Sequence, residues 1–170
     1  MSTNSDYYNT TAQGYEELHG DEQREKMKEC MNCIKPKENE KLLDIGCGTG
    51  ISTEVWNCES FGIDPAEKLI EIAKNKKGKS KYIISDAENI PFEDDYFNYV
   101  ISITAIQNFS DIDKALNEIS RVLKKEGKLV ITSLKDSQKI EIIELKIKNI
   151  FDITNVFDTR IDRFFIGKQK

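Results

Sequence analysis

The chain has 170 residues, of which 38% are hydrophobic and 32% are charged, so it can fill the core of one domain and lacks the profile of a disordered protein. Its formal net charge of −5 argues against strong nucleic-acid binding by the chain alone, because proteins that grip nucleic acid usually display a basic face. No stretch approaches the roughly 20 apolar residues of a membrane span, and the polar N-terminus lacks the apolar core of a signal peptide, which predicts a cytoplasmic protein without a membrane partner.

A polar, helix-permissive segment opens the chain. Between residues 9 and 34, apolar residues such as Leu18, Met27 and Met31 are loosely spaced for one helical face. We expect residues 1–38 to form a helical lid and residues 39–170 to form the core of a single domain.

Short apolar runs then alternate with longer amphipathic ones, which is the rhythm of βαβ units. The predicted strands are residues 41–45, 60–63, 81–85, 99–103 and 128–133. The predicted helices are residues 49–56, 66–74, 111–123 and 139–148. Asp111 is expected to cap the third of these helices and Gly127 to stop it.

Two further strands are predicted at the C-terminal end, over residues 150–156 and 161–166. Only residues 157–160 link them, and so short a link permits an antiparallel hairpin but forbids a parallel crossover. The sequence therefore predicts an α/β fold that is Rossmann-like and doubly wound. Its seven-stranded sheet would be mostly parallel, with one antiparallel strand near the C-terminus.

A glycine-rich turn follows the first predicted strand, in the stretch LLDIGCGTG of residues 42–50. Glycines let the backbone turn tightly and let a ligand approach it without a Cβ in the way. The spacing is G-x-G-x-G, whereas dinucleotide sites need G-x-G-x-x-G. Asp44, just before the turn, would repel a pyrophosphate but favour the sulfonium and ammonium cations of S-adenosylmethionine.

Two more acidic residues end predicted strands. Asp64 lies where doubly wound folds place a carboxylate that accepts hydrogen bonds from ribose hydroxyls; a plain helix cap before Pro65 is the alternative. Asp86 follows the third strand, where its carboxylate would accept from an adenine amine while the Ala87 N–H reaches a ring nitrogen; capping is again the alternative. Ligands of open α/β sheets bind outside these carboxyl ends.

Four stretches resemble the class I S-adenosylmethionine-dependent methyltransferases of the small type that keeps little beyond the catalytic core: LLDIGCGTG, FGIDPAEKLIEIAK, SDAENIPFEDDYFNYVIS and EISRVLKKEGKLVIT. The resemblance runs from about Tyr7 to the C-terminus and is far more specific for the superfamily than for a substrate. It implies S-adenosyl-L-methionine as cofactor and S-adenosyl-L-homocysteine as product.

The resemblance also implies the donor-binding residues. They are Tyr15, Asp44, Gly46, Cys47, Gly48, Asp64, Pro65, Asp86, Ala87 and Ile103. The glycine turn would line the methionine part, Asp64 the ribose, and Asp86 the adenine. In such enzymes an N-terminal segment, here with Tyr8, Ala12 and Tyr15, folds over the donor; Tyr15 is the candidate lid contact, with an aromatic core plug as the alternative.

The acceptor is expected after the fourth strand, where Thr104 and Gln107 are candidate contacts; a loop cap is the alternative role of Gln107. The run around Gln107 resembles that of small-subunit ribosomal RNA guanine-N7 methyltransferases, although Asn108 stands where they have Trp. Those enzymes pair with a small zinc-ribbon activator, which implies such a partner here. Methyl transfer needs alignment and exclusion of water more than an activated side chain, so no catalytic residue is assigned.

Four cysteines are expected to be reduced, structural thiols. Cys30 and Cys33 have the spacing of half a zinc site, but the other half is missing and His19 is the single histidine, so no metal is predicted. Three functions stay open: a methyltransferase acting on RNA, protein or a metabolite, a non-catalytic donor-binding subunit, and a nicotinamide-binding domain. The charge of Asp44 and the glycine spacing favour the first over the third.

Overall fold

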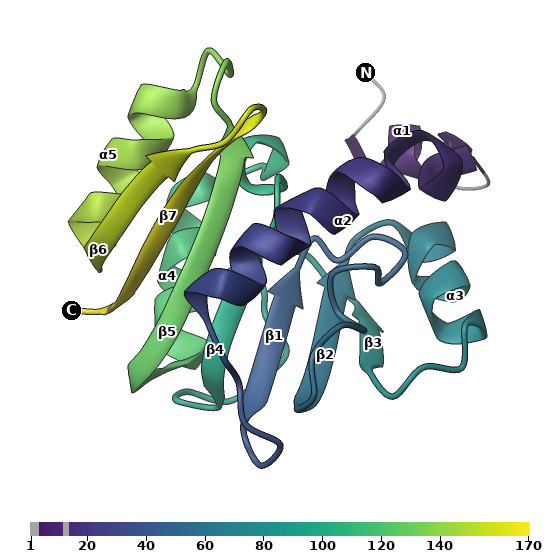
Figure 1. Cartoon of the computed structure of the whole chain (residues 1–170), viewed down its shortest axis with the longest axis horizontal. Coiled ribbons are helices and arrows are strands. Elements are labelled where there is room, and N and C mark those ends of the chain that lie inside the picture. The colour runs from purple at the N-terminus through teal and green to yellow at the C-terminus, as the bar shows by residue number, and fades with distance from the viewer. Residues whose placement is uncertain (1–3, 12–13) are drawn as a thin grey trace.

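The computed structural model describes residues 4–11 and 14–170. Its centre is one seven-stranded sheet of order β3-β2-β1-β4-β5-β7-β6 (Figure 1). The strands are β1 (Lys41–Ile45), β2 (Glu59–Asp64), β3 (Lys81–Ile84), β4 (Phe97–Ser102), β5 (Leu123–Leu134), β6 (Phe151–Asp158) and β7 (Asp162–Gln169). The first five pair in parallel, and β7 is antiparallel to both of its neighbours.

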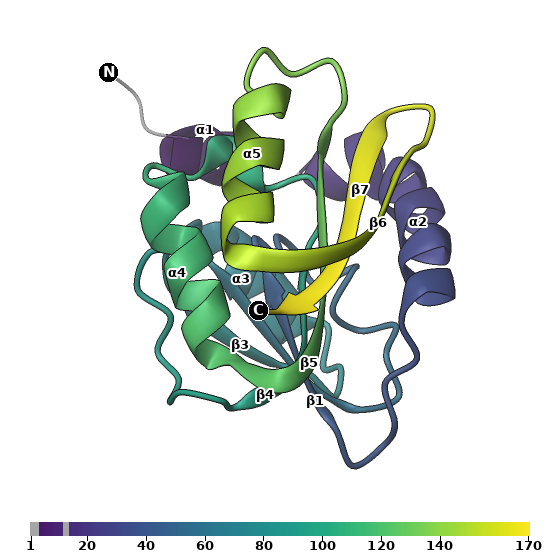
Figure 2. The same ribbon diagram turned by 90° about the vertical axis from the view of Figure 1, so that its left-hand side faces the viewer.

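Helices cover both faces of this sheet. They are α1 (Asn4–Thr11), α2 (Tyr15–Cys33), α3 (Glu67–Asn75), α4 (Ile112–Val122) and α5 (Ile140–Ile150), with a short 3₁₀ turn, η2 (Ile106–Asn108), after β4. Figure 2 shows the sheet nearly edge-on, with α4 and α5 on one face and α2 on the other. The segment predicted as a helical lid contains α1 and α2, of which α2 packs on the sheet itself.

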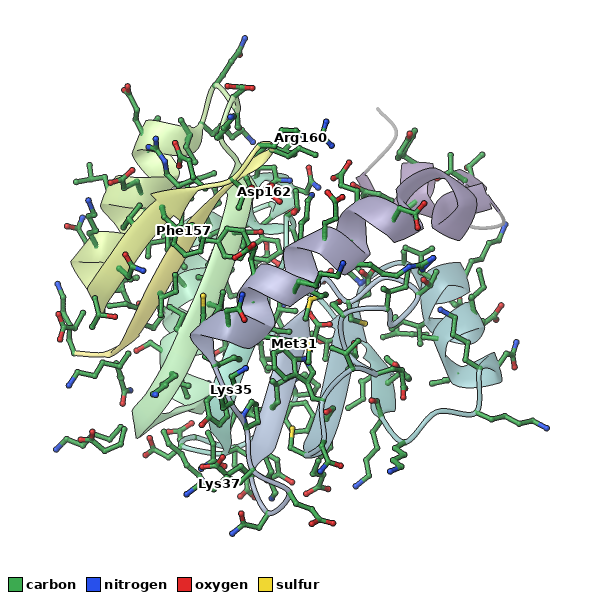
Figure 3. All side chains as sticks on the ribbon, in the orientation of Figure 1. Met31, Lys35, Lys37, Phe157, Arg160 and Asp162 are labelled. Atoms are coloured by element: carbon green, nitrogen blue, oxygen red, sulfur yellow. The ribbon has the colours of Figure 1, made fainter. Side chains whose placement is uncertain are left out.

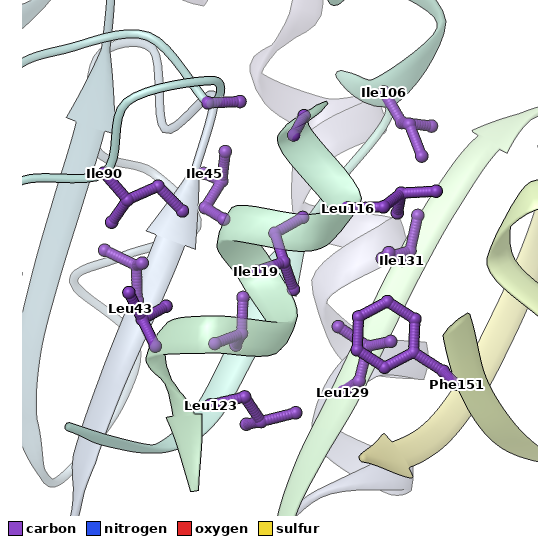
Figure 4. Packing of buried hydrophobic residues seen from close by; sticks show 14 of the residues in the cluster. Leu43, Ile45, Ile90, Ile106, Leu116, Ile119, Leu123, Leu129, Ile131 and Phe151 are labelled. Atoms are coloured by element: carbon purple, nitrogen blue, oxygen red, sulfur yellow. The ribbon is translucent and has the colours of Figure 1, made fainter. Parts of the chain in front are cut away.

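The core follows from the alternation of side chains along the strands. Leu43 and Ile131 face α4, where they pack with Leu116, Ile119 and other fully buried apolar residues (Figure 4). Leu42, on the opposite face, packs beneath α2. The two faces of one strand thus fill two separate apolar clusters.

The predicted fold class is confirmed. The sheet is seven-stranded and mostly parallel, and its one reversed strand, β7, forms the expected hairpin with β6. The Asp111 cap is also confirmed, because its carboxylate accepts from the Lys114 N–H at 3.0 Å.

Two local predictions are wrong. Residues 49–56 form turns and no helix, because the side chains of Ser52 and Thr53 turn back to donate to the Asp44 carboxylate. Gly127 lies inside β5 and does not stop the preceding helix, which ends at Val122 as the chain enters β5. A Cβ at Gly127 would lie 2.5 Å from the Leu123 side chain, so glycine serves close packing at the start of this strand.

Across the described residues, no helix has the length and apolar character that a membrane span requires. Within the same part of the chain, no group of three or more His, Cys, Asp or Glu side chains is placed to hold a metal ion.

Candidate functional site

A cavity opens at the carboxyl ends of β1, β2 and β4, where open α/β sheets bind their ligands. It encloses about 760 Å³, including space open to solvent. Its lining residues come from the lid helices and from the strand ends: Tyr8, Gln23, Gly46, Cys47, Gly48, Thr49, Ile51, Ser52, Asp64, Pro65, Leu69, Ile103, Thr104, Ala105, Asn108 and Phe109.

The glycine loop, residues 46–50, forms one wall of this cavity. Its three glycines all have positive φ, which other residues rarely adopt. A Cβ at Gly46 would lie 2.5 Å from the Cβ of Ala105, so the absence of a side chain lets the loops after β1 and β4 approach each other. The predicted tight turn is present, and the close approach at Gly46 is made by Ala105 of the loop after β4.

Four backbone N–H groups of the glycine loop donate within the protein. Those of Gly46 and Cys47 bond to the carbonyl of Ile63 at 2.9 and 3.1 Å. The Gly48 N–H donates to the Asp64 carboxylate, and the Gly50 N–H to the carbonyl of Cys47. The residues that follow make turns, so no helix begins directly after the loop. The loop is thus held by the strands behind it, with these four amides already used.

Asp44 lies behind the loop and outside the residues that line the cavity. One carboxylate oxygen accepts from the hydroxyls of Ser52 at 2.6 Å and Thr53 at 2.7 Å, and the other has no partner. Burial raises the pKa of Asp44 to about 6, against the lowering effect of the two hydroxyls.

Asp64 does line the cavity, at the end of β2. One of its oxygens accepts from the Gly48 N–H at 2.9 Å and the other from the Ala66 N–H at 2.8 Å. The carboxylate therefore joins the glycine loop to the residue before α3, but it does not cap the helix, whose N-cap residue is Ala66. Burial raises the pKa of Asp64, while the two N–H groups lower it.

Asp86 and Ala87 line a second hollow beside the first. The two hollows share Gly46, Pro65, Asn108 and Phe109, so they form neighbouring parts of one groove. The groove runs past Asp64 to Asp86.

The lid contributes Tyr8 from α1 and Gln23 from α2. The side-chain amide of Asn108 donates to the Tyr8 hydroxyl at 3.2 Å, which ties α1 to the loop after β4. Burial raises the pKa of Tyr8, and the nearby Asp64 adds to the effect. Tyr15 begins α2, but its side chain and residue Ala12 lie outside the described part of the structure, so the lid prediction made for them is not tested.

Of the two candidate acceptor residues, one lines the cavity and the other does not. Thr104 lines the cavity together with Ile103. Gln107 is not among the lining residues: its amide nitrogen donates to the Thr104 carbonyl at 2.7 Å and its amide oxygen accepts from Ser133. Gln107 thus stabilises the loop, which is the alternative role foreseen for it.

Sequence comparison places part of this chain in a known family. Residues 43–131 match the methyltransferase domain. A demethylmenaquinone methyltransferase of Thermotoga maritima is 37% identical over 100 residues, covering 56% of this chain and 44% of that protein. An uncharacterized protein of Methanocaldococcus jannaschii is 32% identical over 127 residues, covering 75% of this chain and 50% of that protein. The chain thus spans about half the length of these curated relatives.

Among solved structures, a chain of the complex between the Haloferax volcanii Trm112 methyltransferase activator and a methyltransferase superposes with a TM-score of 0.84. The two chains are 15% identical, and the match covers 99% of each, so the likeness shows the fold.

A glycine loop after β1, acidic residues at the ends of successive strands and a sheet with one reversed strand define a Rossmann-like domain of the class I S-adenosylmethionine-dependent type. The chain belongs to the methyltransferase domain family.

Proposed function

We propose that the chain binds S-adenosylmethionine in this groove and takes part in transfer of its methyl group, leaving S-adenosylhomocysteine. The proposal rests on one observation, the internal hydrogen bonding of the glycine loop and the turns that follow it. Dinucleotide sites present loop amides and a helix N-terminus to a pyrophosphate. Here four loop amides are bonded within the protein and turns replace the helix, so the loop suits a ligand without phosphate.

The charge of the site supports the same ligand. Asp64 is the single charged residue among the described residues that line the cavity, and Asp44 lies buried behind the loop. One carboxylate in the cavity wall and one buried behind it favour binding of a cation and oppose binding of a phosphate. When bound, S-adenosylmethionine supplies a methyl group already activated on a sulfonium. The protein's own residues need to bind, align the reactants and exclude water.

We assign the glycine loop to the methionine part of the donor, Asp64 with Pro65 to the ribose, and Asp86 with Ala87 to the adenine. The continuity of the two hollows supports this order. Each Asp64 oxygen already accepts one N–H and has lone-pair capacity left for a ribose hydroxyl.

The acceptor would meet the donor beside Ile103 and Thr104, the residues that follow β4. We propose a macromolecular acceptor, on the ground that the Haloferax chain in complex with an activator matches along 99% of its length. The quinone-modifying relative of Thermotoga is covered over only 44% of its length, which makes a small acceptor the alternative.

A small zinc-ribbon protein is the proposed partner. The complex of the Haloferax chain with its activator supports it, and the sheet has an open edge at β3. Ile84 on this strand is 48% exposed, which suits contact with another chain.

Calorimetric titration with S-adenosylhomocysteine and, separately, with NAD tests the ligand. The proposal expects saturable binding of the first and none of the second. Labelled S-adenosylmethionine added with the protein to a cell extract tests transfer, read separately in RNA, protein and solvent-extracted fractions. Binding of NAD instead of the homocysteine compound would overturn the proposal, and so would a lack of label in every fraction with and without the partner.

A further inference from the structure

A buried ion pair lies behind the cavity wall, between α2 and the start of β7. Lys26 of α2 is 5% exposed and Asp162 is fully buried, with 3.0 Å between Nζ and Oδ2. Figure 3 shows Asp162 at the start of β7, next to the hairpin turn at Arg160. Both charged groups also reach Thr104. The Lys26 ammonium donates to its hydroxyl at 2.9 Å, and that hydroxyl donates to Asp162 at 3.0 Å.

Thr104 has a conformation that it does not prefer. Its φ is +55°, in the left-handed region, where a β-branched residue is an outlier under backbone strain. Every polar group of the residue is bonded. The N–H donates to the Thr132 hydroxyl at 2.8 Å, and the carbonyl accepts from Gln107 at 2.7 Å. Such strain persists only where surrounding groups hold the residue in place. Here the groups that bond Thr104 come from four elements: α2, η2, β5 and β7.

The strained residue sets where the cavity wall lies. Thr104 turns the chain so that the next residue, Ala105, packs against Gly46 of the glycine loop. Lys26 also fixes α2, which carries Gln23 to the cavity one turn earlier. The ion pair therefore connects the lid, the wall after β4 and the proposed donor loop.

We propose that Lys26 and Asp162 are positioning residues, which hold Thr104 and Ala105 at the distance from the glycine loop that methyl transfer requires. This inference rests on the proposed function. A buried ion pair is a poor source of stability, because desolvation offsets its Coulomb attraction and an apolar pair is often as stable. Its value here is geometric: a misplacement of about 1 Å costs on the order of 100-fold in rate for reactions that depend on alignment.

The test replaces both charges, because removal of Lys26 alone would leave Asp162 buried without its ammonium partner. Lys26 also pairs with Glu22 at 2.5 Å, so loss of Asp162 alone would leave the ammonium one carboxylate partner. In the double variant K26M/D162N, the asparagine can still accept from Thr104, but the ammonium is gone. Lys28→Met, at an exposed position on the same helix, is the matched control. We expect both proteins to fold and to bind S-adenosylhomocysteine within about threefold of the unaltered chain. At saturating labelled S-adenosylmethionine, K26M/D162N should label the extract fraction that the unaltered chain labels at least about tenfold more slowly.

A crystal structure of K26M/D162N gives an answer that needs no acceptor. The proposal expects Thr104 to leave the left-handed region and Ala105 to move relative to Gly46. An unchanged Thr104, or a labelling rate within twofold of the unaltered chain, would overturn it. If the unaltered chain neither binds S-adenosylhomocysteine nor labels any fraction, the proposed function fails, and the crystal structure still decides whether the ion pair positions Thr104.

Discussion

Asp44 and Asp64 are both buried beside the glycine loop, but their partners give them different roles. Asp64 reaches the cavity and accepts two backbone N–H groups, whereas Asp44 lies behind the loop and keeps one oxygen without a partner. We infer that Asp64 contacts the ligand directly and that Asp44 acts through its charge.

Asp64→Ala should weaken S-adenosylhomocysteine binding about tenfold or more, because it removes the proposed ribose contact and leaves the N–H groups of Gly48 and Ala66 unpaired. Calorimetric titration measures the change. Glu67→Ala, at an exposed residue in the first turn of α3, is the control and should stay within about twofold. Unaltered affinity in Asp64→Ala would show that the ribose assignment is wrong.

Asp44→Asn should stabilise the ligand-free protein at pH 8. The folded pKa of about 6 exceeds the ordinary value of 3.8, so the stability associated with Asp44 is fully present below pH 3.8 and is lost as the pH rises through about 6. Asparagine does not ionise and avoids that loss, which is roughly 3 kcal/mol at most for a shift of about two units.

Urea denaturation at pH 5 and pH 8 measures this effect. The advantage of Asp44→Asn over the unaltered chain should be larger at pH 8, while its affinity for S-adenosylmethionine should fall. An advantage of the same size at both pH values would contradict the account of Asp44.

Residue patterns predicted some residues of the site and missed others. The positions of Gly46 and Asp64 follow from local chemistry, since a tight turn needs glycine and a strand end exposes its last side chain to the groove. Lys26 and Asp162 could not be found this way, because 136 positions separate them in the sequence and nothing local marks either as buried. The internal bonding of Gln107 likewise depends on β5, a distant strand.

At the scale of elements, the glycine loop and the loop after β4 depend on each other. Gly46→Ala should destabilise the protein by roughly 1–3 kcal/mol and weaken S-adenosylhomocysteine binding, because its φ is +74° and the new Cβ would meet Ala105 at 2.5 Å. The double variant G46A/A105G removes the clash but keeps the backbone strain, so it should recover part of the affinity. Denaturation and titration measure both effects; no recovery would show that contact with Ala105 is not the cause.

Helices and strands with strong periodicity were predicted well, as for α4, whose Asp111 cap is confirmed. Residues 49–56 were predicted wrongly as a helix because their tertiary partner, Asp44, outweighs local propensity. Hydroxyl side chains that bond back to a buried carboxylate favour turns over a helix.

At the scale of the whole molecule, the mostly parallel sheet with one reversed strand could be anticipated because short links leave few topologies. The link between β6 and β7 forced an antiparallel pair, and the βαβ rhythm forced parallel pairs elsewhere. The packing of α2 on its own face of the sheet could not be read from its weak periodicity.

Ligand binding should stabilise the fold as a unit, because the groove joins both lid helices to the sheet. S-adenosylhomocysteine at about 100 times its Kd should add about 2.7 kcal/mol and raise Tm by roughly 5–10 °C. Thermal denaturation with NAD at the same concentration is the control, and an equal shift with NAD would contradict the ligand assignment.

The most direct test of the central claim is a crystal structure of the chain with S-adenosylhomocysteine. The account predicts the methionine part against the glycine loop, the ribose hydroxyls on Asp64 and the adenine beside Asp86 and Ala87. A ligand bound outside this groove, or ribose hydroxyls turned away from Asp64, would contradict it.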